Sequence, residues 1–193
     1  MIRAEHTLTR FDAKRKEAVV FNKKTGRMIV MHDDDALIWK NLPIDLKSVL
    51  FDDKSLIKRF KSHEMVQTDG KNGRLFRHNS DILIPPKWFV DLTYCCNLNC
   101  AHCHNKYSIE EPELWDIKKM IAEIAKLGGM YISFGGGEPF LRDDIFEIFD
   151  YVSRFKNLLW SAQSVKHGYR NREKKKKLKL KDLSCFIFSF SLP

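Results

Sequence analysis

The sequence predicts an α/β fold in which a small α+β domain of the winged-helix type precedes part of a TIM-like (βα) barrel. From residue 87 onward, apolar segments typical of strands alternate with amphipathic helical patterns, and the order βαβαβαβ favours a parallel sheet or barrel. Before that point, glycine-containing turns separate short apolar runs, which is typical of hairpins around short helices. We place the boundary near Pro85-Pro86, with domains at residues 1–82 and 83–193.

The first domain is predicted to consist of two hairpins with short helices between them. Residues 17–31 are expected to form the first hairpin, because Gly26 suits a turn with a positive φ angle. An aspartate among residues 33–35 is expected to cap a short helix that contains Trp39. The remaining predicted elements are short helices at residues 45–51 and 52–63, and a second hairpin at residues 65–78 with turns at Asp69-Gly70 and Asn72-Gly73.

The second domain begins with an apolar strand at residues 87–94, which the cysteine-rich segment follows. An amphipathic helix is predicted over residues 111–127, with Pro112 in its first turn and Gly128 after its end. Its apolar positions are Leu114, Ile117, Ile121, Ile124 and Leu127. The later elements are strands at 130–134, 158–165 and 185–192, a helix at 142–156 with Ile145, Ile148, Phe149, Val152 and Phe155 on one face, and a third helix that overlaps a lysine run.

Composition excludes several classes of protein. The chain of 193 residues has 44% hydrophobic residues, enough for a packed core, but no apolar run of 18 residues, so we expect no membrane partner. The N-terminal segment lacks the apolar core of a signal peptide, which predicts a cytoplasmic protein whose thiols stay reduced.

The positive charge of the chain lies mainly in one segment. The net charge is +9, and residues 166–181 contribute +8 of it. The run predicts a solvated helix or a linker. Its alternative role is binding to nucleic-acid phosphates. Aromatic residues do not interleave with the lysines beyond Tyr169, so base stacking is not indicated and we do not expect a nucleic-acid partner.

Four of the five cysteines lie between Cys95 and Cys103, directly after a predicted strand. Cys96, Cys100 and Cys103 form a C-x3-C-x2-C pattern, and reduced thiolates at this density indicate a metal or redox site. Zinc would need a fourth ligand, for which His102, His104 or Cys95 is available. An iron–sulfur cluster held by three cysteines would instead keep one iron open for a ligand. The pattern alone leaves both alternatives open.

A glycine-rich segment, Gly135-Gly136-Gly137-Glu138-Pro139, follows the next predicted strand. Glycines let backbone groups approach a ligand closely, and Glu138 offers a carboxylate to an ammonium group. Alone, such a segment is an ordinary turn. In the predicted order of elements, the cysteine segment follows one strand, a helix comes next, and the glycines follow the second strand.

Together these two segments resemble the cofactor motifs of the radical S-adenosylmethionine (SAM) enzymes. The cysteine run is similar to their C-x3-C-x-φ-C motif, with His102 at the ring-bearing position, and residues 135–139 look like their GGEP motif. The resemblance implies that Cys96, Cys100 and Cys103 bind a [4Fe-4S] cluster. It also implies that the SAM-binding residues are His102, Gly135, Gly136, Gly137, Glu138 and Pro139.

The resemblance further implies a mechanism. The reduced cluster would pass one electron to SAM, giving methionine and a 5′-deoxyadenosyl radical that abstracts a hydrogen atom from the substrate. A one-electron reductant such as ferredoxin or flavodoxin is then implied. The motifs assign no general base, and the catalytic residues remain unknown.

Residues 17–78 resemble the peptide-recognition domain fused to peptide-modifying radical SAM enzymes, which is related to the pyrroloquinoline quinone peptide chaperone. Such domains bind a precursor peptide by adding it as a strand to a sheet edge. The resemblance implies peptide modification or cofactor maturation. The alternative is an accessory domain that stabilises the barrel or pairs with another subunit.

The chain departs from the family pattern in its second half. From Pro86 onward it has 108 residues, about half of the roughly 200 or more that a full barrel needs. We therefore expect a truncated or frame-disturbed chain that contains the N-terminal half of a barrel. Two other functions stay open. One is a non-catalytic peptide-binding module with a vestigial barrel, and the other is a zinc-binding nucleic-acid-binding protein.

Overall fold

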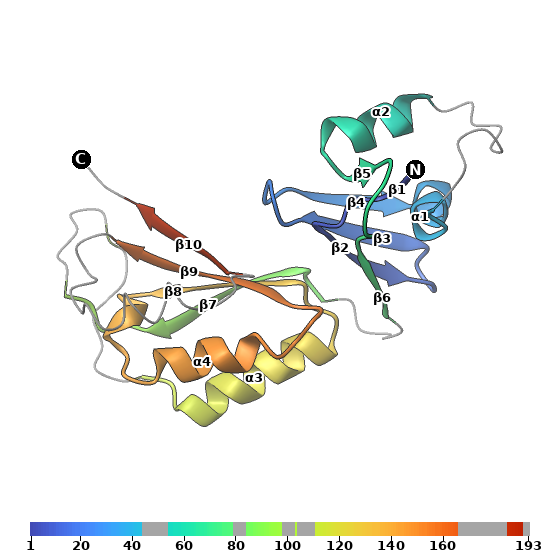
Figure 1. Cartoon of the computed structure of the whole chain (residues 1–193). Coiled ribbons are helices and arrows are strands. Elements are labelled where there is room, and N and C mark those ends of the chain that lie inside the picture. The colour runs from blue at the N-terminus through green and yellow to red at the C-terminus, as the bar shows by residue number, and fades with distance from the viewer. Residues whose placement is uncertain (44–53, 79–83, 98–102, 104–110, 166–184, 191–193) are drawn as a thin grey trace. The chain divides into compact units, whose positions relative to one another are not determined.

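The computed structural model describes the chain except residues 44–53, 79–83, 98–102, 104–110, 166–184 and 191–193. The chain divides into two compact units, Met1–Leu83 and Ile84–Pro193. Figure 1 shows a mainly β unit at the N-terminus and a sheet covered by helices in the second unit.

The first unit contains a four-stranded sheet in the order β4-β3-β2-β6. Strands β3 (Glu17–Asn22) and β4 (Met28–His32) are antiparallel, and Gly26 between them has a φ of 70°. This confirms the predicted first hairpin. Strand β2 (Thr7–Asp12) pairs antiparallel with β3 on its other side.

The predicted second hairpin is wrong. Strand β5 (Val66–Gln67) pairs with β1 (Ile2–Arg3), whereas β6 (Arg74–His78) runs parallel to β2. No strand is predicted from the sequence before residue 17. In the structure, β1 and β2 pair with β5 and β6, the two strands that the predicted hairpin would pair with each other. The Gly73 N–H, for example, donates to the Arg3 carbonyl at 3.1 Å.

Helices α1 (Asp33–Lys40) and α2 (Lys54–Ser62) cover the core of this unit. Trp39 is fully buried, packs edge-on against Phe60 at 5.1 Å between ring centroids, and donates from its indole to the Thr9 hydroxyl at 2.9 Å. The aspartates do not cap α1 as predicted. His32 is the capping residue, and its side chain forms no capping hydrogen bond. The three aspartates lie in the first turn, where their negative charges interact favourably with the positive end of the helix dipole. The helix predicted at residues 45–51 lies outside the described residues.

The second unit is a parallel sheet in the order β10-β9-β8-β7, with α3 and α4 on one face (Figure 1). The strands are β7 (Lys87–Thr93), β8 (Tyr131–Gly136), β9 (Leu159–Val165) and β10 (Cys185–Phe190). The helices are α3 (Leu114–Lys126), α4 (Ile145–Val152) and the short 3₁₀ helix η1 (Pro139–Leu141). This arrangement confirms the predicted α/β fold, although Pro112 precedes α3 rather than lying in its first turn.

Successive side chains along each strand point to opposite faces of the sheet, so that one face packs against the helices and the other faces away from them. Val90, Ile132 and Ala162 belong to the core beneath the helices, together with Ile117 and Ile148 from α3 and α4. The predicted third helix lies outside the described residues. Among the residues that the structure describes, none of the helices has both the length and the apolar character that crossing a membrane requires.

Candidate functional site

The carboxyl ends of β7 and β8 lie side by side because the two strands are parallel. The ladder pairs Asp91 with Gly135 and then Thr93 with Gly136, so a bulge shifts the register at the end of β7. Cys95 and Cys96 follow β7, and the glycine-rich segment continues from β8. The fold therefore brings the two predicted motifs to the same edge of the sheet, where α/β folds build their sites.

Backbone hydrogen bonds join the two segments. The Gly137 N–H donates to the Thr93 carbonyl at 2.7 Å, and the Glu138 N–H donates to the Cys95 carbonyl at 2.9 Å. Residues more than forty positions apart in sequence are thus held in direct backbone contact beside the first motif cysteine, Cys96.

Two glycines make this approach possible. A Cβ on Gly136 would lie 2.2 Å from the Thr93 carbonyl oxygen, and one on Gly137 would lie 2.1 Å from the Cys95 carbonyl oxygen. Gly136 also has a φ of 104°, which side chains rarely tolerate. The sequence predicts that these glycines admit a ligand. In the structure, they also admit the backbone of the cysteine segment.

Glu138 is almost fully buried, with 1% of its surface exposed. One carboxylate oxygen accepts the Phe140 N–H at 3.1 Å at the start of η1. The hydroxyl of Ser164, at the end of β9, lies 3.0 Å from each of the two carboxylate oxygens. The carboxylate is therefore oriented by two segments of the chain.

Thiolates suit a metal centre chemically, and the structure describes two of the three cysteines that the sequence predicts as ligands. Cys96 is half-buried and Cys103 is exposed, and neither forms a disulfide. Cys100 and His102 lie outside the described residues. Within the described part of the chain, no three metal-ligating side chains gather at one point. Thiols next to a glycine-lined backbone edge fit an iron–sulfur cluster that has a bound organic ligand.

Arg142 links this edge of the sheet to neighbouring segments. It is buried and donates to the Leu92 carbonyl at 2.9 Å and to both carboxylate oxygens of Asp144, at 2.8 and 2.7 Å. Burial works against the charge of Arg142, yet the hydrogen-bonded Asp144 and nearby Glu111 raise its pKa above the ordinary value. The guanidinium therefore stays charged at all physiological pH values.

Sequence reasoning missed the polar side chains that support the motifs, namely Thr93, Glu111, Arg142 and Ser164. Thr93 and Ser164 lie at the carboxyl ends of strands, a position that is a usable signal for site residues in parallel sheets. No local spacing marks Glu111 or Arg142 as parts of the site, because the contacts of Arg142 with Leu92, Glu111 and Pro112 join distant segments, and only its pair with Asp144 is local.

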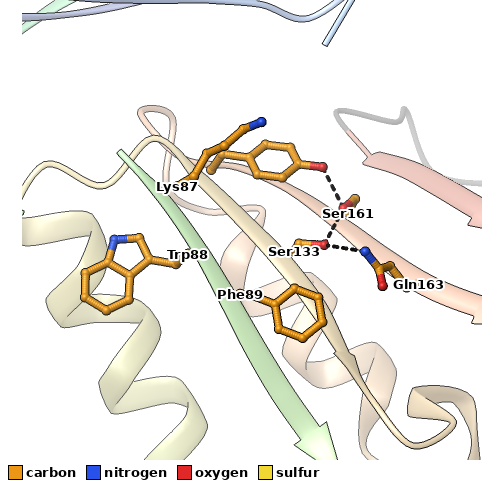
Figure 2. Close-up of a pocket in the computed structure, with 7 residues that line it drawn as sticks. Lys87, Trp88, Phe89, Ser133, Ser161 and Gln163 are labelled. Carbon is orange, nitrogen blue, oxygen red and sulfur yellow. Dashed lines mark hydrogen bonds between the residues drawn. The ribbon is translucent and has the colours of Figure 1, made fainter. Parts of the chain in front are cut away.

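The face of the sheet opposite the helices carries a pocket of about 410 Å³ (Figure 2). Its polar wall is a chain of hydrogen bonds: Tyr131 donates to Ser161 at 2.7 Å, and Ser161 and Gln163 each donate to Ser133 at 3.3 Å. Phe89 forms the apolar wall, with 59% of its surface exposed. Its ring also lies against Gly135, since a Cβ there would be 2.5 Å from the ring. The pocket therefore borders the glycine-rich strand end.

Comparison with curated proteins finds relatives of several kinds. The mycofactocin maturase MftC of Mycobacterium ulcerans is 35% identical over 81 residues, which are 40% of this chain and 21% of that protein. The PqqA peptide cyclase of Rhodopseudomonas palustris is 33% identical over 86 residues, 41% of this chain and 23% of the relative. The 7,8-dihydro-6-hydroxymethylpterin dimethyltransferase of Methanocaldococcus jannaschii is 27% identical over 190 residues, covering 87% of this chain and 37% of the relative.

Among solved structures, SuiB of Streptococcus suis bound to its precursor peptide SuiA has a TM-score of 0.57 at 13% identity. The match covers 96% of this chain and 47% of SuiB. SuiB bound to SAM gives a TM-score of 0.59. The likeness shows a shared fold. The chain spans less than half the length of SuiB and of each of these curated relatives.

The sequence profile of the radical SAM superfamily matches residues 90–186, which is half of the chain. The matched region begins in β7 and includes both motifs and the parallel strands that carry them. Members of this family use a [4Fe-4S] cluster and SAM, which agrees with the cofactors that the motifs predict. The chain belongs to the radical SAM superfamily.

Proposed function

We propose that this chain binds a [4Fe-4S] cluster and SAM and performs radical chemistry on a substrate. Cys96, Cys100 and Cys103 would hold the cluster. The observation that supports the proposal is the backbone contact of Glu138 with Cys95, because it holds residues 135–139 beside Cys96, as binding of SAM to the cluster would require. When bound, the cluster supplies the electron that cleaves SAM to methionine and a 5′-deoxyadenosyl radical.

The side chains of this unit would orient SAM and exclude water. The carboxylate of Glu138 would meet the methionine ammonium group, a charge-assisted contact favoured by burial. Gly135, Gly136 and Gly137 would present their backbone to the methionine moiety while Gly136 and Gly137 admit the backbone of Thr93 and Cys95. Pro139 would fix the turn into η1. His102 would contribute a ring beside the cluster.

We further propose that the substrate is a peptide. Residues 83–193 would form the cofactor-binding half of a barrel, and residues 1–82 would recognise a precursor peptide. The names of two similar proteins, PqqA peptide cyclase and SuiB bound to SuiA, support a peptide. Within the described residues, β4 pairs only with β3, so its other edge has the geometry that strand addition needs.

A one-electron donor of the ferredoxin or flavodoxin type would reduce the cluster. We propose a cytoplasmic location, because cluster-binding thiols must stay reduced until iron is inserted.

The proposed reaction predicts a defined product. We expect the anaerobically reconstituted chain, given SAM and dithionite, to form 5′-deoxyadenosine and methionine in about equal amounts. Chromatography of the quenched reaction measures both. A chain that carries the cluster but forms neither product would contradict the proposed chemistry and would favour a non-catalytic peptide-binding module.

The proposed partner predicts where a peptide binds. Peptides selected for binding to the full chain from a phage-displayed random library are expected to slow hydrogen exchange along β4 (Met28–His32). The physical reason is that a peptide added as a strand pairs with the edge of that strand. Protection that is confined to the second unit would contradict peptide recognition by the first.

A second candidate substrate is a pterin. The alignment with the dimethyltransferase covers 190 residues and includes parts of both units, so the sequence similarity extends beyond the two motifs. The discriminating measurement is 5′-deoxyadenosine formation with a selected peptide or with 7,8-dihydro-6-hydroxymethylpterin added. A rate increase with the pterin alone would replace the peptide proposal.

A further inference from the structure

Arg142 joins several segments of the chain near the candidate site. It directly follows η1 and exposes 5% of its surface. Besides the Leu92 carbonyl at the end of β7, it donates to the Pro112 carbonyl at 3.1 Å, just before α3. The bidentate pair with Asp144 anchors the same guanidinium to the start of α4.

Glu111 extends this contact toward the cysteines. One of its carboxylate oxygens lies 3.5 Å from the Arg142 guanidinium, and the other accepts a hydrogen bond from the Thr93 hydroxyl. The Thr93 hydroxyl oxygen in turn accepts the Cys95 N–H at 3.0 Å. A continuous series of polar contacts therefore runs from Arg142 through Glu111 to the backbone beside Cys96.

These contacts hold both ends of the segment that contains the motif cysteines. Leu92 and Thr93 precede that segment in the chain, whereas Glu111 and Pro112 follow it. Bringing the two ends of a long segment together lowers its conformational entropy. When contacts within the protein already hold the ends together, this entropic cost does not reduce the affinity for a ligand. The planar guanidinium suits this role because it donates in several fixed directions at once.

We propose that Arg142 and Glu111 are positioning residues that hold the two ends of the cysteine segment, at Leu92-Thr93 and Glu111-Pro112, close together, so that the segment retains a bound cluster longer. The pair acts through Thr93 and the backbone and touches neither cluster nor SAM. This inference rests on the proposed function. We expect these contacts to slow the loss of a bound cluster from the protein. Contacts that support metal ligands typically change the affinity of a site for its metal by roughly 10- to 100-fold.

The test compares Arg142→Lys and Glu111→Gln with the unmodified full chain. A lysine keeps the charge but cannot reach both carbonyls and Asp144 together, and a glutamine keeps a partner for Thr93 but loses the ion pair. After anaerobic reconstitution, an iron chelator is added and loss of the cluster absorbance is followed. We expect roughly 10-fold faster loss in both variants. Arg154→Lys is the matched control, because Arg154 is exposed and lies against Tyr151 in the same unit.

The melting temperature of each metal-free variant separates positioning from folding. Cluster loss at the rate of the unmodified chain in either folded variant would overturn the inference, as would equal acceleration in Arg154→Lys. If Arg142→Lys does not fold, Glu111→Gln alone decides. An unmodified chain that takes up no iron–sulfur cluster would instead overturn the proposed function, and the inference with it.

Discussion

A Gly137→Ala variant is expected to lose most of its capacity to bind the cluster and SAM. The added Cβ would lie 2.1 Å from the Cys95 carbonyl oxygen and close to the backbone of Tyr94 as well. Because the obstacle is backbone, the two segments must separate, and the bond between Glu138 and Cys95 must break or lengthen. We expect iron bound per chain after reconstitution to fall by roughly 10-fold or more.

Gly135→Ala is the matched control for the iron content alone, because Gly135 is itself a proposed SAM-binding residue. A Cβ on Gly135 would meet only the end of the Phe89 ring, which is 59% exposed and can swing away into the pocket. We therefore expect iron content within about a factor of two of the unmodified chain, since surface rearrangements of this kind cost little. Equal loss of iron in both variants would contradict the role assigned to the contact between the segments.

A Cys96→Ala variant is expected to bind no [4Fe-4S] cluster, because each cysteine of a three-cysteine set holds one iron. Cys95→Ala is the control, since Cys95 is adjacent, lies outside the motif and contributes its carbonyl rather than its thiol to the contact with Glu138. Its loss of stability should be about 1 kcal/mol, as for an average substitution. Iron analysis and the visible absorption spectrum measure both variants.

The result that would contradict this assignment is a full cluster in Cys96→Ala combined with its loss in Cys95→Ala. That outcome would shift the first ligand by one residue. The spacing from Cys95 to Cys100 and Cys103 would not match the family motif, and the motif would no longer support binding of SAM to an open iron.

Local patterns predicted those parts of the fold in which sequence neighbours are also partners. The hairpin at residues 17–31 was predicted because Gly26 supplies its turn, and α3 because its apolar residues recur at helical spacing. The hairpin at residues 65–78 failed for the opposite reason. Its strands find long-range partners, β1 and β2, and nothing within that segment reveals such pairing.

The same distinction holds at the candidate site. The two motifs could be predicted to meet because they follow neighbouring parallel strands, and the structure places Cys95 against Glu138. The supporting contacts could not be predicted. Arg142 binds Leu92, fifty positions away, and Ser164 reaches Glu138 from a third strand. Contacts of this kind depend on how the strands and helices pack, which no spacing of residues along the chain specifies.

The cysteine segment is proposed to hold a [4Fe-4S] cluster with an iron open to SAM. The most direct measurement is the electron paramagnetic resonance spectrum of the anaerobically reconstituted, reduced full chain, recorded with and without SAM. We predict a [4Fe-4S] signal that changes when SAM is added, because the ligand alters the surroundings of the open iron. A cluster signal indifferent to SAM, or a protein that binds zinc and no iron, would contradict the claim.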